Sequence, residues 1–429
     1  MKTNFLPAIL LGLLFPAPIF AQQHNLDFYL EQAKTNSAFI HQNRNEKQLV
    51  QLDMEQIRKI YSNPEVTVEA SVLFAPIISR DGGPGKFQLV TKDASDYVGY
   101  DLAATDGGQY SGVVSVNQGI FNGRKIDTYS SRAEIQQQIH DNTIQLTEHE
   151  LENAVRHQYL LCLKSKREAN NNLELAQEVE REIAILKELV RSAIYKQSDL
   201  QLLEINRQNY EQGYETFQAE YRDNIYNLNL LCGINENADW EIDPVEFSLN
   251  REKVTNSQFL ASFYLDSLAI IADRNISELK YQPQVNLFAN AGMNAVYAPA
   301  FNRFGFSTGA TFSLTLFDGH QRKTEFEKSQ INLENIQFSK MQTLTQNEIQ
   351  KSFTLDKLHS LDKRISLSEN QLEQYKQLMN LYKIQLEQGN ISVMEYSYLL
   401  KDISEKKQER LLFEIEKQMV INAYNYWNY

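Results

Sequence analysis

Cysteine, proline and glycine are all scarce in this sequence. Its 429 residues include 2 cysteines, 9 prolines and 17 glycines. The two cysteines, Cys162 and Cys232, are too few for a disulfide framework, and their spacing fits no zinc site. Because proline and glycine interrupt helices and strands, their scarcity favours long unbroken elements over a loop-rich fold.

Basic residues are outnumbered by acidic ones, 42 against 55, which gives a formal net charge of −13. A protein that binds nucleic acid without sequence preference carries an excess of lysine and arginine to meet the phosphates. We therefore expect no nucleic acid partner.

Long apolar runs are missing beyond the N-terminus. Residues 1–21 are typical of a secretory signal peptide, with Lys2 before an apolar stretch and a cleavage site after Ala21. No cysteine follows that site, so we expect no lipid attachment there. No later segment has the roughly 18 consecutive apolar residues that a membrane-spanning helix needs. If the chain crosses a membrane, it must use β-strands.

The sequence contains little that indicates catalysis. The glycine-rich segment 80–87 has Phe87 where a phosphate-binding loop needs serine or threonine. His149 precedes His157 by eight residues, whereas a zinc-binding HExxH helix needs a spacing of about four. We therefore expect no enzyme activity, no cofactor and no metal.

The chain contains two copies of one plan. The segment SVNQGIFNGRK around Phe121 is similar to SLTLFDGHQRK around Phe317, and these two phenylalanines are 196 residues apart. Asp199 and Glu395, in a second pair of similar segments, have the same separation. Two landmarks at one offset indicate a duplication. We expect a first repeat at 22–235, a linker at 236–255 and a second repeat at 256–429.

Each repeat predicts a helix, two strands, a long helix and a returning helix. The helices are expected at about 25–61, 123–191, 198–232, 256–281, 319–386 and 393–427, and the strands at about 64–78, 109–121, 283–298 and 305–317. Apolar residues recur in the long helices with the spacing of a coiled-coil seam. The expected fold is thus mainly α with some β, built on long helical hairpins.

The four strand segments alternate between apolar and small polar residues. One face of the strands would carry valine, leucine, alanine and phenylalanine, and the other would carry Glu69, Asn286, Asn290 and Asn294. This length and pattern suit transmembrane strands with a polar lumen, although strands of a soluble sandwich alternate in the same way. Four strands cannot close a barrel, and open edges are not tolerated in lipid. Spanning a membrane would therefore require several chains.

In the order of these features the sequence resembles the TolC-type outer-membrane factors, over about residues 24–429. The resemblance rests on the duplicated plan, the FNG and FDG turns after the second and fourth strands, and the turn and helix from Gly389 to Leu400. It implies a homotrimer with a 12-stranded β-barrel and a periplasmic α-barrel. It also implies the outer membrane of a Gram-negative bacterium, with outer-membrane lipid, a periplasmic adaptor (membrane fusion protein) and an inner-membrane transporter of RND or ABC type as partners. The chain would be the passive exit duct of an efflux pump or a type I secretion system.

The same resemblance implies where the narrow end of such a duct lies. Glu395, Tyr398 and Asp199 fall on positions around the closed pore, and a threefold ring of carboxylates would favour cations and raise its own pKa. The helix turns that would meet the adaptor contain Ser192, Ala193, Gly389 and Asn390. Two alternatives stay open: Glu395 can be a solvated helix charge, and the chain can be a periplasmic coiled-coil adaptor or structural protein.

Overall fold

The computed structural model describes residues 25–73, 77–79, 86–88, 109–235, 241–252, 257–296 and 304–429. The expected signal peptide and most of the polar stretch 80–108 lie outside the described residues. The protein is mainly helical, and it divides into two compact units that interleave along the chain. Among the described residues, no helix has both the length and the apolar content needed to cross a membrane.

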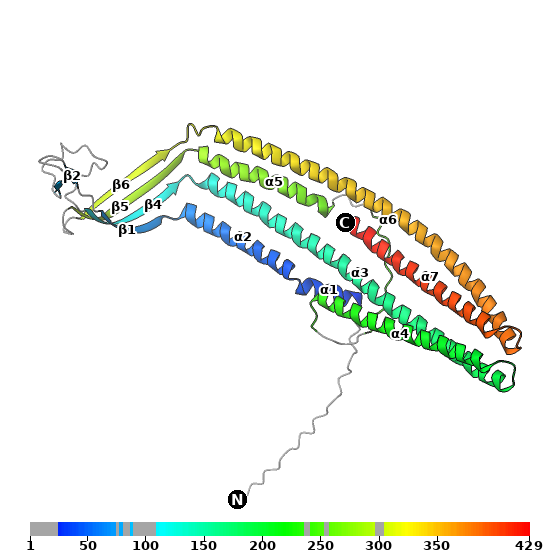
Figure 1. The fold of residues 1–429 in the computed structure, drawn as a ribbon. Coiled ribbons are helices and arrows are strands. Elements are labelled where there is room, and N and C mark those ends of the chain that lie inside the picture. Colours follow the sequence, from blue (N-terminus) through cyan, green and yellow to red (C-terminus); the bar gives the residue numbers. More distant parts are fainter. Residues whose placement is uncertain are drawn as a thin grey trace, which may run out of the picture. The chain divides into compact units, whose positions relative to one another are not determined.

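The helices and the four long strands follow the predicted order (Figure 1), but the structure adds two short strands, β2 and β3, which pair with each other between β1 and β4 in the chain. The helices are α1 (Leu26–Asn36), α2 (Ala38–Ser62), α3 (Gly123–Arg191), α4 (Gln197–Cys232), α5 (Gln258–Glu278) with a 3₁₀ turn η2 (Leu279–Tyr281), α6 (Gln321–Glu387) and α7 (Val393–Trp427). The strands are β1 (Glu65–Leu73), β2 (Ile77–Ser79), β3 (Lys86–Gln88), β4 (Gln109–Ile120), β5 (Gln284–Val296) and β6 (Phe304–Ser313).

The first helix is broken, although the sequence predicts one helix over 25–61. Ser37 takes an extended conformation between α1 and α2, with φ −66° and ψ 111°. The preceding Asn36 donates from Nδ2 to the carbonyls of Cys232 and Gly233 at 2.9 and 3.2 Å. This contact ties the end of α1 to the end of α4. The helix therefore ends at Asn36, and the next residue, Ser37, is one that readily adopts an extended backbone.

One unit comprises residues 39–146 and 255–346 and contains a four-stranded antiparallel sheet in the order β1-β4-β5-β6. Every strand of this sheet is joined directly to a helix: β1 to α2, β4 to α3, β5 to α5 and β6 to α6 (Figure 1). The helices contact in the same lateral order, through the ion pairs Lys47–Asp141, Arg132–Asp273 and Arg322–Glu278. The helices α2, α3, α5 and α6 therefore lie side by side in the same order as the strands to which they are joined.

The last strand is shorter than predicted. The alternation of the sequence suggests a strand over 305–317, but β6 ends at Ser313. Ser313 pairs with Gln284, the first residue of β5, so no neighbouring strand is left to bond residues further along. Beyond Ser313 the chain turns, and Asp318 accepts a hydrogen bond from the hydroxyl of Tyr281. The missing partner, not the local residue pattern, ends the strand.

The other unit comprises residues 1–38, 147–254 and 347–429, of which the described parts form a helical bundle. Its buried side chains form two large clusters and a small third one around Leu361. The first surrounds Tyr29 and Tyr159 of α1 and α3, whose rings meet edge to face at 6.0 Å. The second joins α3, α4, α6 and α7, and it includes the seam residues Val179, Ile183, Leu186, Met379 and Leu386. Burial of the seam accounts for the coiled-coil spacing in the sequence.

The two helix turns of this unit have the same geometry. After α3, Ala193 N donates to Val190 O and Ile194 N donates to Leu189 O, at 3.0 and 2.9 Å. After α6, Gly389 N donates to Leu386 O and Asn390 N to Gln385 O, at 3.1 and 2.8 Å. Every atom of the second pair is offset by 196 residues from its counterpart. Both turns are Schellman motifs, which need a left-handed residue after the helix.

Ala193 and Gly389 hold that left-handed position, with φ 61° and 72°. Glycine adopts it freely, whereas alanine is strained there by roughly 1–2 kcal/mol. A Cβ at position 389 would also lie 2.7 Å from Cγ2 of Ile194, in the facing turn. The first repeat therefore carries strain that the second repeat avoids.

We predict opposite effects for exchanges at these two turns. Gly389→Ala should lower the free energy of unfolding by at least ~1–2 kcal/mol, because it adds left-handed strain and a close contact. Ala193→Gly should leave that free energy unchanged or raise it by up to ~1 kcal/mol, because the released strain exceeds the added freedom of the unfolded chain. Unfolding followed by circular dichroism measures both. Equal effects of the two exchanges would contradict the assignment.

Candidate functional site

The four-stranded sheet has two chemically distinct faces. The register places Thr67, Ser115, Asn290 and Ser307 in one row across all four strands. Beyond the next row on the same face, a further row contains Ser71, Ser111 and Asn294, and the hydroxyls of the two serines are 2.6 Å apart. Because side chains alternate along a strand, these rows share one face, and this face is polar and nearly uncharged.

The residues predicted for a lumen fall on this polar face. Asn286 pairs with Gly119 and Thr311, and Glu69 pairs with Val113. Asn286 and Asn290 line a hollow of about 410 Å³ near the helix end of the sheet. The sheet thus brings together Glu69, Asn286, Asn290 and Asn294, which come from two strands that are far apart in the sequence.

One aromatic residue of the polar face was not predicted. Phe288 has the same strand parity as Asn286 and Asn290, and its ring lies over Gly309 of the neighbouring strand. A Cβ at position 309 would come within 2.6 Å of this ring, so the ring can take this position only because residue 309 is glycine. The period-two alternation of β5 is enough to predict that Phe288 lies on the polar face, two residues from both Asn286 and Asn290.

The opposite face of the sheet is apolar and exposed. Val68 of β1 is 78% exposed and Phe306 of β6 is 80% exposed. Both outer strands also leave one edge without a hydrogen-bonded neighbour among the described residues. A sheet with an uncovered apolar face and two open edges is incomplete as a single chain in water.

The helices next to the open edges show the same exposure. Phe39, Leu49, Leu52 and Ile60 of α2 are all at least half exposed. In this unit α6 likewise exposes Phe326, Ile331, Phe338 and Met341. The helices that carry these apolar side chains are those joined to the edge strands β1 and β6. The open edges of the sheet, at β1 and β6, therefore continue into helices α2 and α6, which expose apolar side chains.

In the helical unit, Glu395 and Asp199 cap their own helices. Glu395 Oε2 accepts hydrogen bonds from the backbone N and the hydroxyl of Ser392, both at 2.9 Å, and Ser392 Oγ accepts from Glu395 N. Asp199 Oδ2 accepts from Lys196 N at 2.9 Å. Both acids thus serve as the third helical residue of a capping arrangement, at the same place in each repeat.

Capping also changes the expected charge chemistry of Glu395. The bonds from the backbone and the side chain of Ser392 hold the pKa of Glu395 below its ordinary value. A ring of like charges would raise that pKa, as the sequence reasoning expects for a trimer. Within one chain the local bonds act in the opposite direction and keep the carboxylate ionised.

Three residues near the turns were missed by the sequence analysis. Tyr195 donates from its hydroxyl toward the carbonyls of Leu386 and Ile391, at 3.0 and 2.7 Å, and so joins the first turn to the second. Tyr396 is fully buried, whereas the predicted Tyr398 is 62% exposed. Lys383 lies between Glu178 and Glu182, at 2.8 and 3.3 Å.

Lys383 stays charged in this setting. Burial lowers its pKa, but the hydrogen bond and the charge of Glu178, followed by those of Glu182, outweigh that effect and raise the pKa overall. The pKa of the Tyr396 hydroxyl is raised by burial first and then by the same two carboxylates. No local pattern marks these residues, because their partners come from different helices.

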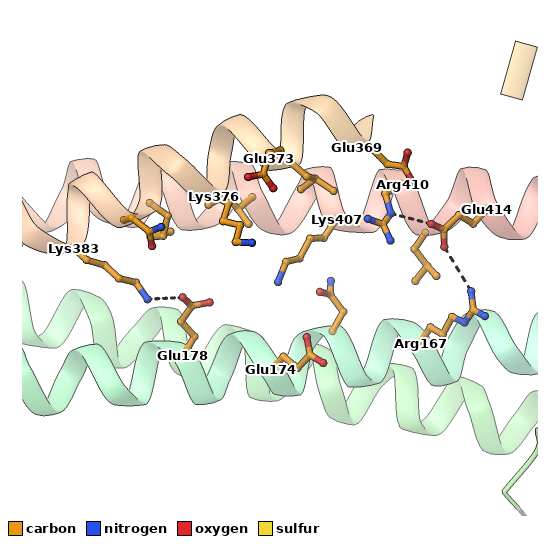
Figure 2. A pocket seen from close by; sticks show the side chains of 16 residues that line it. Arg167, Glu174, Glu178, Glu369, Glu373, Lys376, Lys383, Lys407, Arg410 and Glu414 are labelled. Carbon is orange, nitrogen blue, oxygen red and sulfur yellow. Dashed lines mark hydrogen bonds and ion pairs between the residues drawn. The ribbon is translucent and has the colours of Figure 1, made fainter. Parts of the chain in front are cut away.

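A charged cavity of about 770 Å³ lies between α3, α6 and α7 of this unit. Figure 2 shows side chains of both signs around it, among them Lys376 and Lys407 from α6 and α7 and Glu174 from α3. Its lining holds five basic and five acidic residues: Arg167, Lys376, Lys383, Lys407, Arg410, Glu174, Glu178, Glu369, Glu373 and Glu414. With balanced charge, the cavity favours neither anions nor cations.

The fold is that of known outer-membrane proteins. The chain superposes on VceC, an outer membrane protein of Vibrio cholerae, with a TM-score of 0.69 and 12% identity over 94% of this chain and 95% of that one. For the MtrE outer membrane channel of Neisseria gonorrhoeae the TM-score is 0.66, with 10% identity over 94% and 88% of the two chains. For the CmeC outer membrane channel of Campylobacter jejuni the TM-score is 0.66, with 10% identity over 94% of this chain and 85% of that one.

These similarities confirm, at the level of fold, the resemblance to TolC-type outer-membrane factors. They cover nearly the whole chain, so both repeats take part in the match. The three solved structures named above are an outer membrane protein and two outer membrane channels. The amino-acid sequence itself matches no protein-family model and no curated protein.

The contact between the two turns gives a second prediction. Tyr195→Phe should lower the free energy of unfolding by about 1 kcal/mol, because the carbonyls of Leu386 and Ile391 lose their shared donor. Tyr398→Phe is the matched control, because it removes the same hydroxyl from an exposed tyrosine near the start of α7. Thermal unfolding of both variants measures the difference. A shift of equal size in both would show that the Tyr195 hydrogen bonds contribute nothing specific.

Proposed function

We propose that this chain is one subunit of a homotrimeric channel in the outer membrane of a Gram-negative bacterium, extending into the periplasm. One observation carries the proposal: a sheet with an exposed apolar face, a small-polar face and two open edges. Lipid covers an apolar face without cost, and it excludes open edges. The likeness in fold to the outer membrane channels MtrE and CmeC supports the same reading.

Copies of this sheet can close on one another. The four strands alternate in direction, so β6 of one copy runs antiparallel to β1 of the next. Three copies would give 12 strands in a closed barrel without edges. The polar face with Glu69, Asn286, Asn290 and Asn294 would then line the lumen. The exposed side chains of α2 and α6 would meet in the same interface and extend the closure into a periplasmic α-barrel.

The helix turns would form the periplasmic end of the duct. Ser192, Ala193, Gly389 and Asn390 lie in these turns, where an adaptor and a transporter of RND or ABC type would act. Glu395, Asp199 and Tyr398 are exposed or half-buried next to the turns, which leaves them accessible to a pore formed by three copies. Conduction would be passive, in an efflux pump or a type I secretion system, and the sequence of segment 80–87 does not fit a phosphate-binding loop.

Membrane insertion is tested by charges on the two faces of β1. Val68→Lys should reduce assembled protein in the outer membrane, since a lysine facing lipid near mid-depth costs roughly 2–4 kcal/mol per chain. Thr67→Lys is the control: it adds the same charge to the adjacent residue, but on the polar face. Membrane fractionation and gel filtration in detergent measure the outcome.

A soluble adaptor would give a different result. Such a protein would be found in the soluble periplasmic fraction, would need no detergent, and would accept both lysines alike because both positions would face water. Equal tolerance of Val68→Lys and Thr67→Lys would therefore refute the channel.

The pore role of Glu395 needs a variant that keeps the helix cap. Glutamine also fits the third position of a capping box, so Glu395→Gln removes the charge and retains the cap. We expect a lower preference for cations in planar-bilayer conductance, whereas Glu405→Gln, further along α7, should leave the preference unchanged. If Glu395→Gln keeps the selectivity of the unmodified protein, Glu395 acts only as a cap.

A further inference from the structure

We propose that a pocket where the helices meet the sheet binds the phosphate group of a membrane phospholipid. The pocket has a volume of about 570 Å³ and lies among the ends of α2, α3, α5 and α6. The proposal rests on the channel function above, because it requires the strands to lie in a bilayer. Its basis is the charge, the aromatic rings and the position of this pocket.

The pocket carries an excess of positive charge. Its lining contains Lys125, Arg274, Lys280 and Arg322, against two acids, Glu278 and Glu325. Each acid already has a basic partner, because Arg322 pairs with Glu278 and Lys328 pairs with Glu325.

The other three cations have no carboxylate within ion-pair distance among the residues the structure describes. Lys280 donates only to the amide oxygen of Gln321 at 3.3 Å, while Lys125 and Arg274 face aromatic rings. Three basic groups around one hollow, none of them in an ion pair with a described carboxylate, suit a phosphate.

Aromatic rings hold these cations in place. Lys125 Nζ lies 5.4 Å from the ring centre of Tyr61, and Arg274 Cζ lies 5.4 Å from that of Phe326. Tyr281 is flanked by Lys280 and Arg322, at 5.8 and 5.1 Å. The contacts fix the cations without neutralising them, so their charge stays available to a ligand.

The position of the pocket identifies the source of the phosphate. Tyr61 and Tyr281 precede the first apolar-face residues of their strands, Val66 and Val285, by only a few residues. In a membrane-spanning sheet, tyrosines at that level lie at the boundary between hydrocarbon and headgroups. Basic side chains at the same level contact lipid phosphates. A phospholipid headgroup is therefore the expected ligand, and free phosphate is the alternative source of the same chemistry.

Native mass spectrometry of the intact detergent-solubilised protein can test this site with phosphatidylglycerol. Lys280→Gln should weaken retention of the lipid about fivefold, and the combination with Lys125→Gln and Arg274→Gln roughly a hundredfold. Lys340→Gln, an exposed lysine further along α6, is the matched control and should change nothing. Gel filtration and circular dichroism establish that each variant is assembled and folded.

The outcomes separate the pocket from the channel. Equal lipid retention by the triple variant and by Lys340→Gln, in assembled protein, overturns the lipid site and leaves the channel intact. Displacement of the lipid by millimolar inorganic phosphate, with no preference for the lipid, identifies an anion site and also overturns it. Failure of the channel itself would show differently, as a monomer that remains soluble without detergent.

Discussion

The two outer edges of the sheet, at β1 and β6, have no paired strand within the described part of the chain, and this is the constraint on which the rest of the structure depends. Backbone amides and carbonyls need partners, and in a hydrocarbon environment only another strand can supply them. The edges alone would permit many kinds of association. The exposed rows of α2 and α6 narrow the choice, because they extend the open sides of the sheet into the helices. A partner must cover strand and helix together, and a second copy of this chain, as proposed above, would do so.

Repetition explains the local chemistry of the turns. Residues 193 and 389 share a left-handed conformation, and residues 199 and 395 share a capping role, all at one offset. The acidic character of positions 199 and 395 therefore has a sufficient cause in helix capping, before any pore is considered. Tyr195 breaks the equivalence, because it reaches from the first turn to the carbonyls of the second.

The predictable parts of this structure are those decided by neighbours in sequence. The extent of α3 and α7 follows from the absence of proline and from turn signals at their ends, and the two faces of the sheet follow from period-two spacing. The break at Ser37 cannot be predicted in this way, because it depends on the hydrogen bond from Asn36 to the end of α4. The end of β6 at Ser313 depends on where β5 begins. Tyr195 and Lys383 acquire their roles only once distant helices are packed.

The dimensions of β5 favour the membrane insertion proposed above over a soluble sandwich. Its apolar face runs without a charged residue from Val285 to Ala295. At about 3.3 Å per residue this stretch is roughly 33 Å long, and a strand tilt of about 40° reduces its height to ~25 Å. That height equals the apolar band of an outer-membrane barrel. Lys280 and Tyr281 stand just outside the stretch, at the level where the proposed barrel would meet lipid headgroups.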